Sequence, residues 1–106
     1  MARVLSISTD LMLGSRVDAA LSAAGHEVVT AGAIAAAPLD GVDIIVADLE
    51  VESPEALVAI GVPVLGYYSH VDVDTKALAE AAGVDKVVPR SRMARELPDL
   101  VAALLT

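Results

Sequence analysis

The run Val42-Asp43-Ile44-Ile45-Val46-Ala47-Asp48 gives the strongest indication of the fold. It is a short, nearly unbroken apolar run, rich in β-branched residues, that ends on a carboxylate. Without polar alternation, such a run is typical of a strand covered on both faces, as in a parallel sheet. Asp48 then falls at the carboxyl end of the strand, the edge of an open α/β sheet where ligands usually bind. A local role is the alternative, since aspartate after a strand also forms turns and caps helices.

On both sides of this stretch, apolar runs alternate with helix signals. Thr9 or Asp10 can cap a first helix that stops before Gly25, and Ser53 followed by Pro54 is a good helix start. The predicted strands cover residues 4–8, 26–30, 42–48, 62–68 and 86–89. The predicted helical segments cover residues 11–24, one or two turns within 31–37, a short helix from 53 that ends by 60, and a helix from 72 or 74 to 82.

The tail of the chain contains Pro98, which has no amide hydrogen and clashes with the preceding turn of a regular helix. We therefore predict a short turn over residues 91–96 and a separate helix over 98–105. Five strands that alternate with helices imply parallel pairing through right-handed crossovers. The sequence thus predicts one domain over residues 1–106, built as a three-layer α/β sandwich.

Composition and charge exclude several classes of protein. The 106 residues include no cysteine, which excludes disulfides and thiol chemistry, and only two histidines, which argues against a histidine-rich metal site. The formal net charge of −8 argues against binding to nucleic acid or to anionic membranes. No apolar run approaches transmembrane length and the first residues lack the layout of a signal peptide, so we expect a cytoplasmic protein.

Five stretches in order carry a resemblance to a known family: Arg-Val-Leu-Ser-Ile from residue 3, Ala-Ala-Gly-His-Glu-Val-Val from 23, Val-Asp-Ile-Ile-Val-Ala-Asp-Leu from 42, Val-Pro-Val-Leu from 62, and Ala-Ala-Gly-Val-Asp-Lys-Val-Val from 81. Together they resemble a response-regulator receiver domain over nearly the whole chain. The resemblance implies a flavodoxin-like fold with a five-stranded parallel sheet in the order 2-1-3-4-5. The second and third helices are short for the family, whereas the fourth and fifth are nearly complete.

The resemblance also implies a site at the carboxyl edge of the sheet. Receivers hold Mg²⁺ with an acidic pair after the first strand and accept phosphate from a histidine kinase on an aspartate after the third strand. A hydroxyl after the fourth strand and a lysine after the fifth then bind the phosphoryl group. Asp48 falls on the phosphoacceptor position. The hydroxyl position falls on Tyr68, or on Ser69 with a shift of one residue, and the lysine position falls on Arg90.

Two departures from the family pattern concern this chemistry. The acidic pair falls on Ser8 and Thr9, with Asp10 one residue late. Mg²⁺ needs hard, preferably charged oxygen ligands, so Asp10 and Asp48 would form a poorer metal site than usual. Arg90 can bind phosphate through two donors but does not imitate the geometry of lysine, and Ser91 follows it where the family usually has proline.

Other polar residues belong to the same predicted edge. His70, just past the fourth strand, could titrate near neutral pH or bind an anion, or it could be an ordinary loop residue. Arg90 is expected to form a resting ion pair with Asp48, which would keep the site inactive without any ligand. Arg16 is expected on a solvated face of the first helix and outside the site.

Two functions follow from the sequence. In the first, the chain is a stand-alone pseudo-receiver that signals through protein contacts, without phosphorylation and without a cofactor. In the second, it is a two-component phosphoacceptor that is phosphorylated on Asp48 with Mg²⁺. The expected partners are a histidine kinase or a downstream effector, with a homodimer through the fourth and fifth helices as a further option. A dinucleotide fingerprint and a nucleophile elbow are both missing from the sequence, so we expect no enzyme activity and no catalytic residues.

Overall fold

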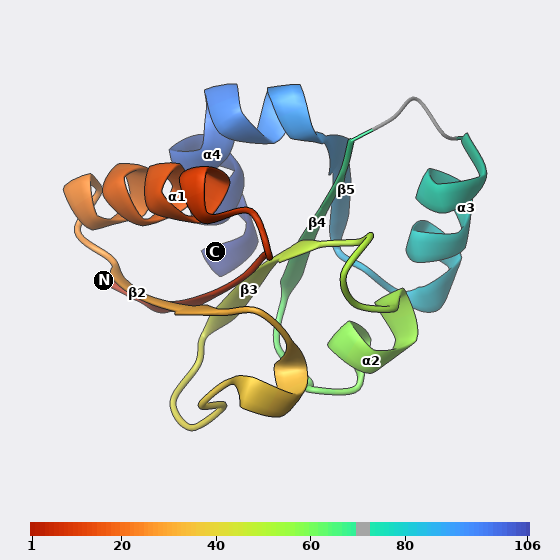
Figure 1. The fold of residues 1–106 in the computed structure, drawn as a ribbon, viewed down its shortest axis with the longest axis horizontal. Helices are drawn as coiled ribbons and strands as arrows, with labels where there is room; N and C mark the ends of the chain where they lie inside the picture. The colour runs from red at the N-terminus through yellow and green to blue at the C-terminus, as the bar shows by residue number, and fades with distance from the viewer. Residues whose placement is uncertain (70–72) are drawn as a thin grey trace.

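The computed structural model describes residues 1–69 and 73–106. Strands and helices alternate along the chain, as Figure 1 shows. The strands are β1 (Arg3–Ile7), β2 (Glu27–Ala31), β3 (Ile44–Asp48), β4 (Val64–Tyr68) and β5 (Lys86–Pro89). The helices are α1 (Leu11–Ala23), the 3₁₀ turn η1 (Ile34–Ala36), α2 (Pro54–Val58), α3 (Val73–Ala82) and α4 (Arg90–Leu105). Apart from α4, these elements differ from the predicted ranges only at their ends.

The five strands form one sheet in the order β2-β1-β3-β4-β5, and all neighbours are parallel. The flavodoxin-like order predicted from the resemblance is therefore confirmed. β3 lies between β1 and β4, with Ala47 opposite Ile7 and Asp48 opposite Tyr67. This register brings the carboxyl ends of β1, β3 and β4 to one edge of the sheet.

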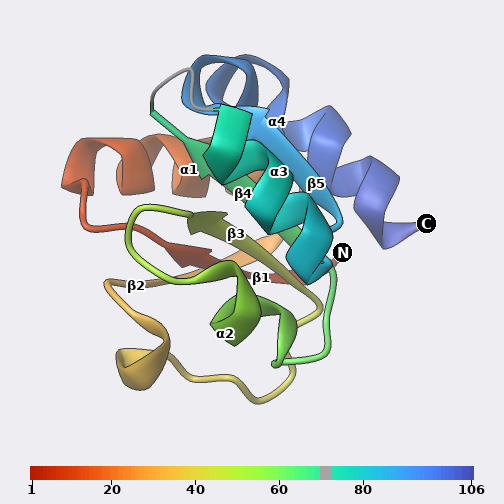
Figure 2. The same cartoon turned by 90° about the vertical axis from the view of Figure 1, so that its right-hand side faces the viewer.

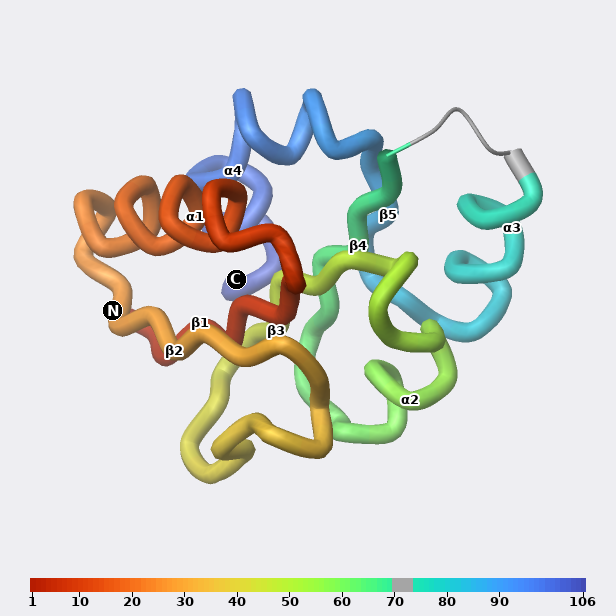
Figure 3. Tube along the Cα trace, in the orientation of Figure 1, coloured from red at the N-terminus to blue at the C-terminus, as the bar shows by residue number. Residues whose placement is uncertain are grey.

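Helices cover both faces of the sheet and bury two apolar clusters. One cluster joins alternate residues of β3 to α1 and α4, which lie side by side in the trace of Figure 3. The other cluster joins Ile45 and Ala47 of β3 to η1, α2 and α3, on the face that Figure 2 turns toward the viewer. Tyr67 belongs to the first cluster and Tyr68 to the second, so consecutive tyrosines face opposite sides of the sheet as the pleat requires.

The second and third helices are short, as predicted. η1 has 3 residues and α2 has 5. Ser53 caps α2, because its Oγ accepts a hydrogen bond from the Ala56 amide at 3.2 Å. None of the helices in residues 1–69 and 73–106 is long and apolar enough to cross a bilayer.

The prediction of a turn followed by a separate final helix was wrong, because α4 runs unbroken from Arg90 to Leu105 with Pro98 inside it. Four buried side chains lie on the inner face of α4 on both sides of the proline: Met93, Leu97, Leu100 and Val101. Burial of one such side chain is worth about 1.5–3 kcal/mol, whereas proline inside a helix costs about 3 kcal/mol. Pro98 itself faces solvent, so the stripe is buried in full and outweighs the penalty.

Candidate functional site

The predicted site residues come from four segments that end or begin at the carboxyl edge of the sheet. Asp10 follows β1, Asp48 ends β3, Ser69 follows β4 and Arg90 begins α4 directly after β5. β1 and β3 feed crossovers to opposite faces of the sheet, which makes this edge the topological switch point of the fold. His70 lies outside the described residues.

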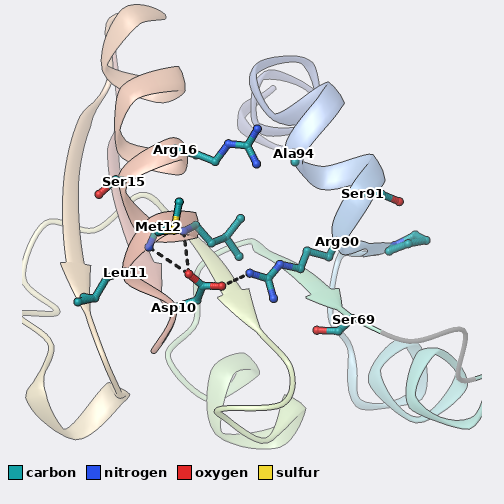
Figure 4. A pocket seen from close by; sticks show the side chains of 11 residues that line it. Asp10, Leu11, Met12, Ser15, Arg16, Ser69, Arg90, Ser91 and Ala94 are labelled. Atoms are coloured by element: carbon teal, nitrogen blue, oxygen red, sulfur yellow. Dashed lines mark hydrogen bonds and ion pairs between the residues drawn. The ribbon is translucent and has the colours of Figure 1, made fainter.

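Asp10 uses both of its carboxylate oxygens. Oδ1 accepts hydrogen bonds from the amides of Met12 and Leu13, each at 3.0 Å, and so caps α1. Oδ2 pairs with the Arg90 guanidinium, which reaches across from α4 (Figure 4). The amide of Leu13, and next the hydrogen bond from Arg90, hold the pKa of Asp10 below its ordinary value of 3.8. Asp10 is therefore a helix cap and half of an ion pair at once.

The predicted resting ion pair between Arg90 and Asp48 was wrong, because the Arg90 guanidinium binds Asp10 instead. The reason is the packing of α1 against α4, which presents the capped first turn of α1 to the first residue of α4. Asp48, in contrast, is only 7% exposed, and an ion pair at that depth would require a larger loss of hydration from the arginine. In the part of the chain that the structure describes, Asp48 has no ion-pair partner.

Asp48 is a buried carboxyl group with one hydrogen bond, which Oδ1 accepts from the Glu50 amide at 2.9 Å. Burial raises the pKa of Asp48; the Glu50 amide opposes this, and the nearby Glu50 carboxylate adds to it. The contact to the amide two residues ahead is the local turn-forming role that aspartate often plays after a strand. The same group thus sits at the switch point and prefers its neutral form more than an ordinary aspartate does.

The two candidate hydroxyls, Tyr68 at the end of β4 and Ser69 directly after it, do not face a common site. Tyr68 packs into the apolar cluster under α2 and α3. Ser69 is exposed, and its Oγ donates a hydrogen bond to Glu50 Oε2 at 3.3 Å. A phosphoryl group on Asp48 would therefore have to break the contact between Ser69 and Glu50 before the hydroxyl could bind it.

Tyr67 is a residue of the site that the sequence did not predict. It lies opposite Asp48 in the register of β3 and β4 and is 1% exposed. Its hydroxyl is near Ser8, yet among the described residues it makes no hydrogen bond of normal geometry. Burial raises the pKa of this phenol. Its place beside Asp48 follows from the register of β3 against β4, because residues opposite each other in parallel strands share a face, and no local pattern in the sequence reports that register.

These residues do not fit Mg²⁺. Neither of the two carboxylates expected to hold the ion is free to do so. Asp10 already binds two amides and a guanidinium. Asp48 is buried, and its pKa is raised. Ser8 and Thr9 add hydroxyls without charge, and Ser8 Oγ already accepts a hydrogen bond from the Asp10 amide. Across residues 1–69 and 73–106 no group of three histidine, aspartate or glutamate side chains could hold a metal ion. A hard divalent cation needs more free charged oxygens than this edge provides.

Comparisons with known proteins support the fold. No protein-family model matches the sequence, and no curated protein matches it either. Among solved structures, a response regulator receiver domain protein from Clostridium thermocellum is similar, with a TM-score of 0.85, 18% identity and coverage of 99% of this chain and 94% of that one. A CheY-like receiver domain protein from Methanospirillum hungatei is similar with a TM-score of 0.85 and 15% identity, over 99% of this chain and 94% of that one. A response regulator protein from Burkholderia multivorans is similar with a TM-score of 0.78 and 23% identity, over 100% of this chain and 97% of that one.

Each of these likenesses covers nearly the whole of both chains. Since the identities lie below 25%, what they show is the fold. The chain has the fold of response-regulator receiver domains, and the resemblance stated from the sequence is confirmed at this level.

Proposed function

We propose that this chain is a pseudo-receiver: a signalling module of the two-component type that acts through contacts with other proteins, without phosphorylation of Asp48. The observation that carries the proposal is the double engagement of Asp10, whose carboxylate binds the first turn of α1 with one oxygen and Arg90 with the other. The arginine at the lysine position is thereby held away from Asp48. Among residues 1–69 and 73–106, a phosphoryl group on Asp48 would meet neither a metal site nor a free cation.

The state of Asp48 supports the same proposal. Attack on an incoming phosphoryl group requires an ionised carboxylate, and the charge that develops requires compensation. Burial raises the pKa of Asp48, and the phenol of Tyr67 lies opposite it in the adjoining strand. Ionisation of the carboxyl group that would accept phosphate is therefore unfavourable, and the described residues of the site compensate little of the resulting negative charge.

The second candidate is the phosphoacceptor itself, phosphorylated on Asp48 with Mg²⁺. The position of Asp48 at the carboxyl end of the central strand favours it. An NMR titration with Mg²⁺, followed by beryllofluoride as a phosphate mimic, separates the two candidates through the amides of Asp10, Asp48, Ser69 and Arg90. We expect no saturable shift. Saturable shifts that disappear in Asp48→Ala would refute the pseudo-receiver and establish the phosphoacceptor.

The titration needs a positive control on the same scaffold. The double variant Ser8→Asp and Thr9→Asp places two carboxylates at the positions where receivers carry their acidic pair. Because these side chains add charged oxygens beside Asp48, we expect this variant to bind Mg²⁺ more tightly than the natural chain. The proposal is supported if Mg²⁺ shifts the amide signals of the double variant and leaves those of the natural chain unchanged.

The proposed partners are signalling proteins, either a histidine kinase or a downstream effector. A homodimer through α3 and α4 is a further proposal, tested by sedimentation at high concentration. We propose a cytoplasmic location and no catalytic activity or cofactor of the chain's own. Its effect would then depend on which proteins its surface selects.

A further inference from the structure

An open groove lies between the N-terminal ends of α1 and α4, beside the pair of Asp10 and Arg90 (Figure 4). Its volume is about 1130 Å³. Met12 and Arg16 line it from α1, Pro89 lines it from the end of β5, and Ser91 and Ala94 line it from the start of α4. The groove lies on the α1 and α4 side of the sheet. Asp10, Ser69 and Arg90 of the predicted receiver-type site line part of it, whereas Met12, Arg16 and Ala94 have no part in the receiver-type chemistry of Asp48.

The first turn of α1 exposes more apolar surface than the fold requires. Leu11 is 85% exposed and Met12 is 80% exposed, and the two are consecutive. The contacts of the same helix with the core are made by Leu13, Val17 and Leu21, which are buried. An exposed apolar pair next to a groove is a common mark of a binding surface, and methionine adapts its shape to varied partners.

Charge identifies the kind of partner. Arg16 points from α1 across the groove toward Ala94 (Figure 4), and within residues 1–69 and 73–106 it has no ion-pair partner. The charge of Arg90, in contrast, is matched by Asp10. Asp10, Arg16 and Arg90 together carry a net charge of +1 within a chain of net charge −8. The groove is a positive spot on an acidic surface, so it favours a carboxylate and the rest of the surface repels one.

We propose that this groove binds a segment of a partner protein in which a carboxylate stands next to apolar side chains. The carboxylate pairs with Arg16, and the apolar side chains cover Met12 and Ala94. The inference rests on the proposed function, because it names the surface and the partner chemistry of a module that acts through protein contacts. It assigns Arg16, which the sequence placed on a merely solvated face, as the residue that determines specificity.

Selection of a random peptide library on the intact chain tests this inference. We expect enrichment of peptides with aspartate or glutamate beside leucine, isoleucine or phenylalanine. We expect Arg16→Glu to weaken their binding at least tenfold. Arg95→Glu is the matched control, because Arg95 is an exposed arginine of α4 whose side chain is 70% exposed and which does not line the groove. We expect it to leave binding within about twofold, and the amide spectra of both variants verify that they fold.

Three results would overturn the inference. The first is enrichment of basic or uncharged peptides, or of none. The second is an equal loss of binding in Arg16→Glu and Arg95→Glu, which would show that only the net charge of the chain matters and not the position of Arg16. The third is a self-associated chain that Arg16→Glu dissociates, which would make a second copy the occupant. Failure of the proposed function is recognised separately: a chain that binds Mg²⁺ and beryllofluoride and still selects acidic peptides refutes the pseudo-receiver and leaves the groove assignment intact.

Discussion

The guanidinium of Arg90, the first residue of α4, pairs with the carboxylate of Asp10, the residue that caps α1. The pair ties together the beginnings of the two helices that cover one face of the sheet. It also removes from Asp48 both of the charged groups that the sequence had assigned to its neighbourhood. Under the proposed function, this contact is one reason why Asp48 would not accept phosphate.

The first prediction concerns the pH dependence of this pair. The pKa of Asp10 is lowered in the folded chain, so its contribution to stability is present above the ordinary value of 3.8 and is lost as the pH falls through the folded value. Asp10→Asn retains a good capping side chain but loses the charge. We expect it to be less stable than the natural chain at pH 7, with the difference shrinking below pH 3.8. Urea unfolding at a series of pH values measures this.

A double-mutant cycle with Arg90→Gln isolates the pair from the cap. The coupling between the two positions should be present at pH 7 and should weaken in high salt, because both side chains are partly exposed. A coupling that is absent at pH 7 would show that Asp10 acts only as a cap. A coupling that persists unchanged at pH 2 would show that the contact with Arg90 does not depend on the charge of Asp10.

The second prediction concerns Asp48, whose pKa is shifted in the opposite direction. Because the folded chain raises this pKa, the folded state binds the proton more tightly than the unfolded state, and stability falls as the pH rises from 3.8 through the folded value. Asp48→Asn removes the ionisation and can still accept the hydrogen bond from the Glu50 amide. We expect the variant to match the natural chain at low pH and to exceed it at pH 7. Equal stability at both pH values would contradict the assigned shift.

The third prediction concerns the phenol of Tyr67, which makes no hydrogen bond of normal geometry to the residues that the structure describes. Leaving a buried polar group without a partner costs about 1–3 kcal/mol, so Tyr67→Phe should raise the free energy of unfolding by about 1 kcal/mol. Tyr68→Phe is the matched control in the adjoining cluster and should change stability little. Chemical denaturation with an unchanged m-value gives both numbers. A loss of stability in Tyr67→Phe would mean that the hydroxyl is hydrogen-bonded, with Ser8 as the nearest candidate.

The fourth prediction compares two glycines. A Cβ on Gly66 of β4 would lie 2.8 Å from Leu49 Cδ2, whereas a Cβ on Gly14 of α1 would meet nothing within 4 Å. Gly66→Ala should destabilise the chain by about 1–3 kcal/mol through overpacking. Gly14→Ala should stabilise it by about 0.5–1 kcal/mol, because alanine restricts the unfolded chain and favours the helix. Unfolding curves of the two variants should therefore move in opposite directions.

Leu49→Ala tests the cause of the Gly66 effect. If the clash with Leu49 is responsible, Gly66→Ala should cost less in the Leu49→Ala background than in the natural chain. An equal cost in both backgrounds would place the strain in the backbone of β4 and not in the side chain above it.

The fold was predictable because its signals are local. The apolar run that ends at Asp48, the cap and proline at Ser53 and Pro54, and the regular alternation of strands and helices each depend on neighbouring residues. The continuity of α4 was not predictable by the same means. Pro98 breaks helices by a local rule, but the stripe from Met93 to Val101 gains its burial from the sheet and from α1, which no local pattern reports.

The site was predictable in its location and not in its contacts. The ends of β1, β3, β4 and β5 lie at one edge in any parallel sheet, so Asp10, Asp48, Ser69 and Arg90 had to fall near it. The partner of Arg90 depends on how α1 and α4 pack, and the place of Tyr67 depends on the register of β3 against β4. Both are tertiary relations between segments far apart in the chain.

The engagement of both Asp10 oxygens has a consequence for how the chain could carry information. A domain that switches needs two arrangements of similar free energy, and the cap and the ion pair both favour the arrangement seen in the structure. Under the proposed function each copy would offer its partner a constant affinity. The fraction of partner occupied would then follow the number of copies present, by mass action. The cell would adjust such a signal through synthesis and degradation of the chain, in the way it adjusts the dose of a titrating inhibitor.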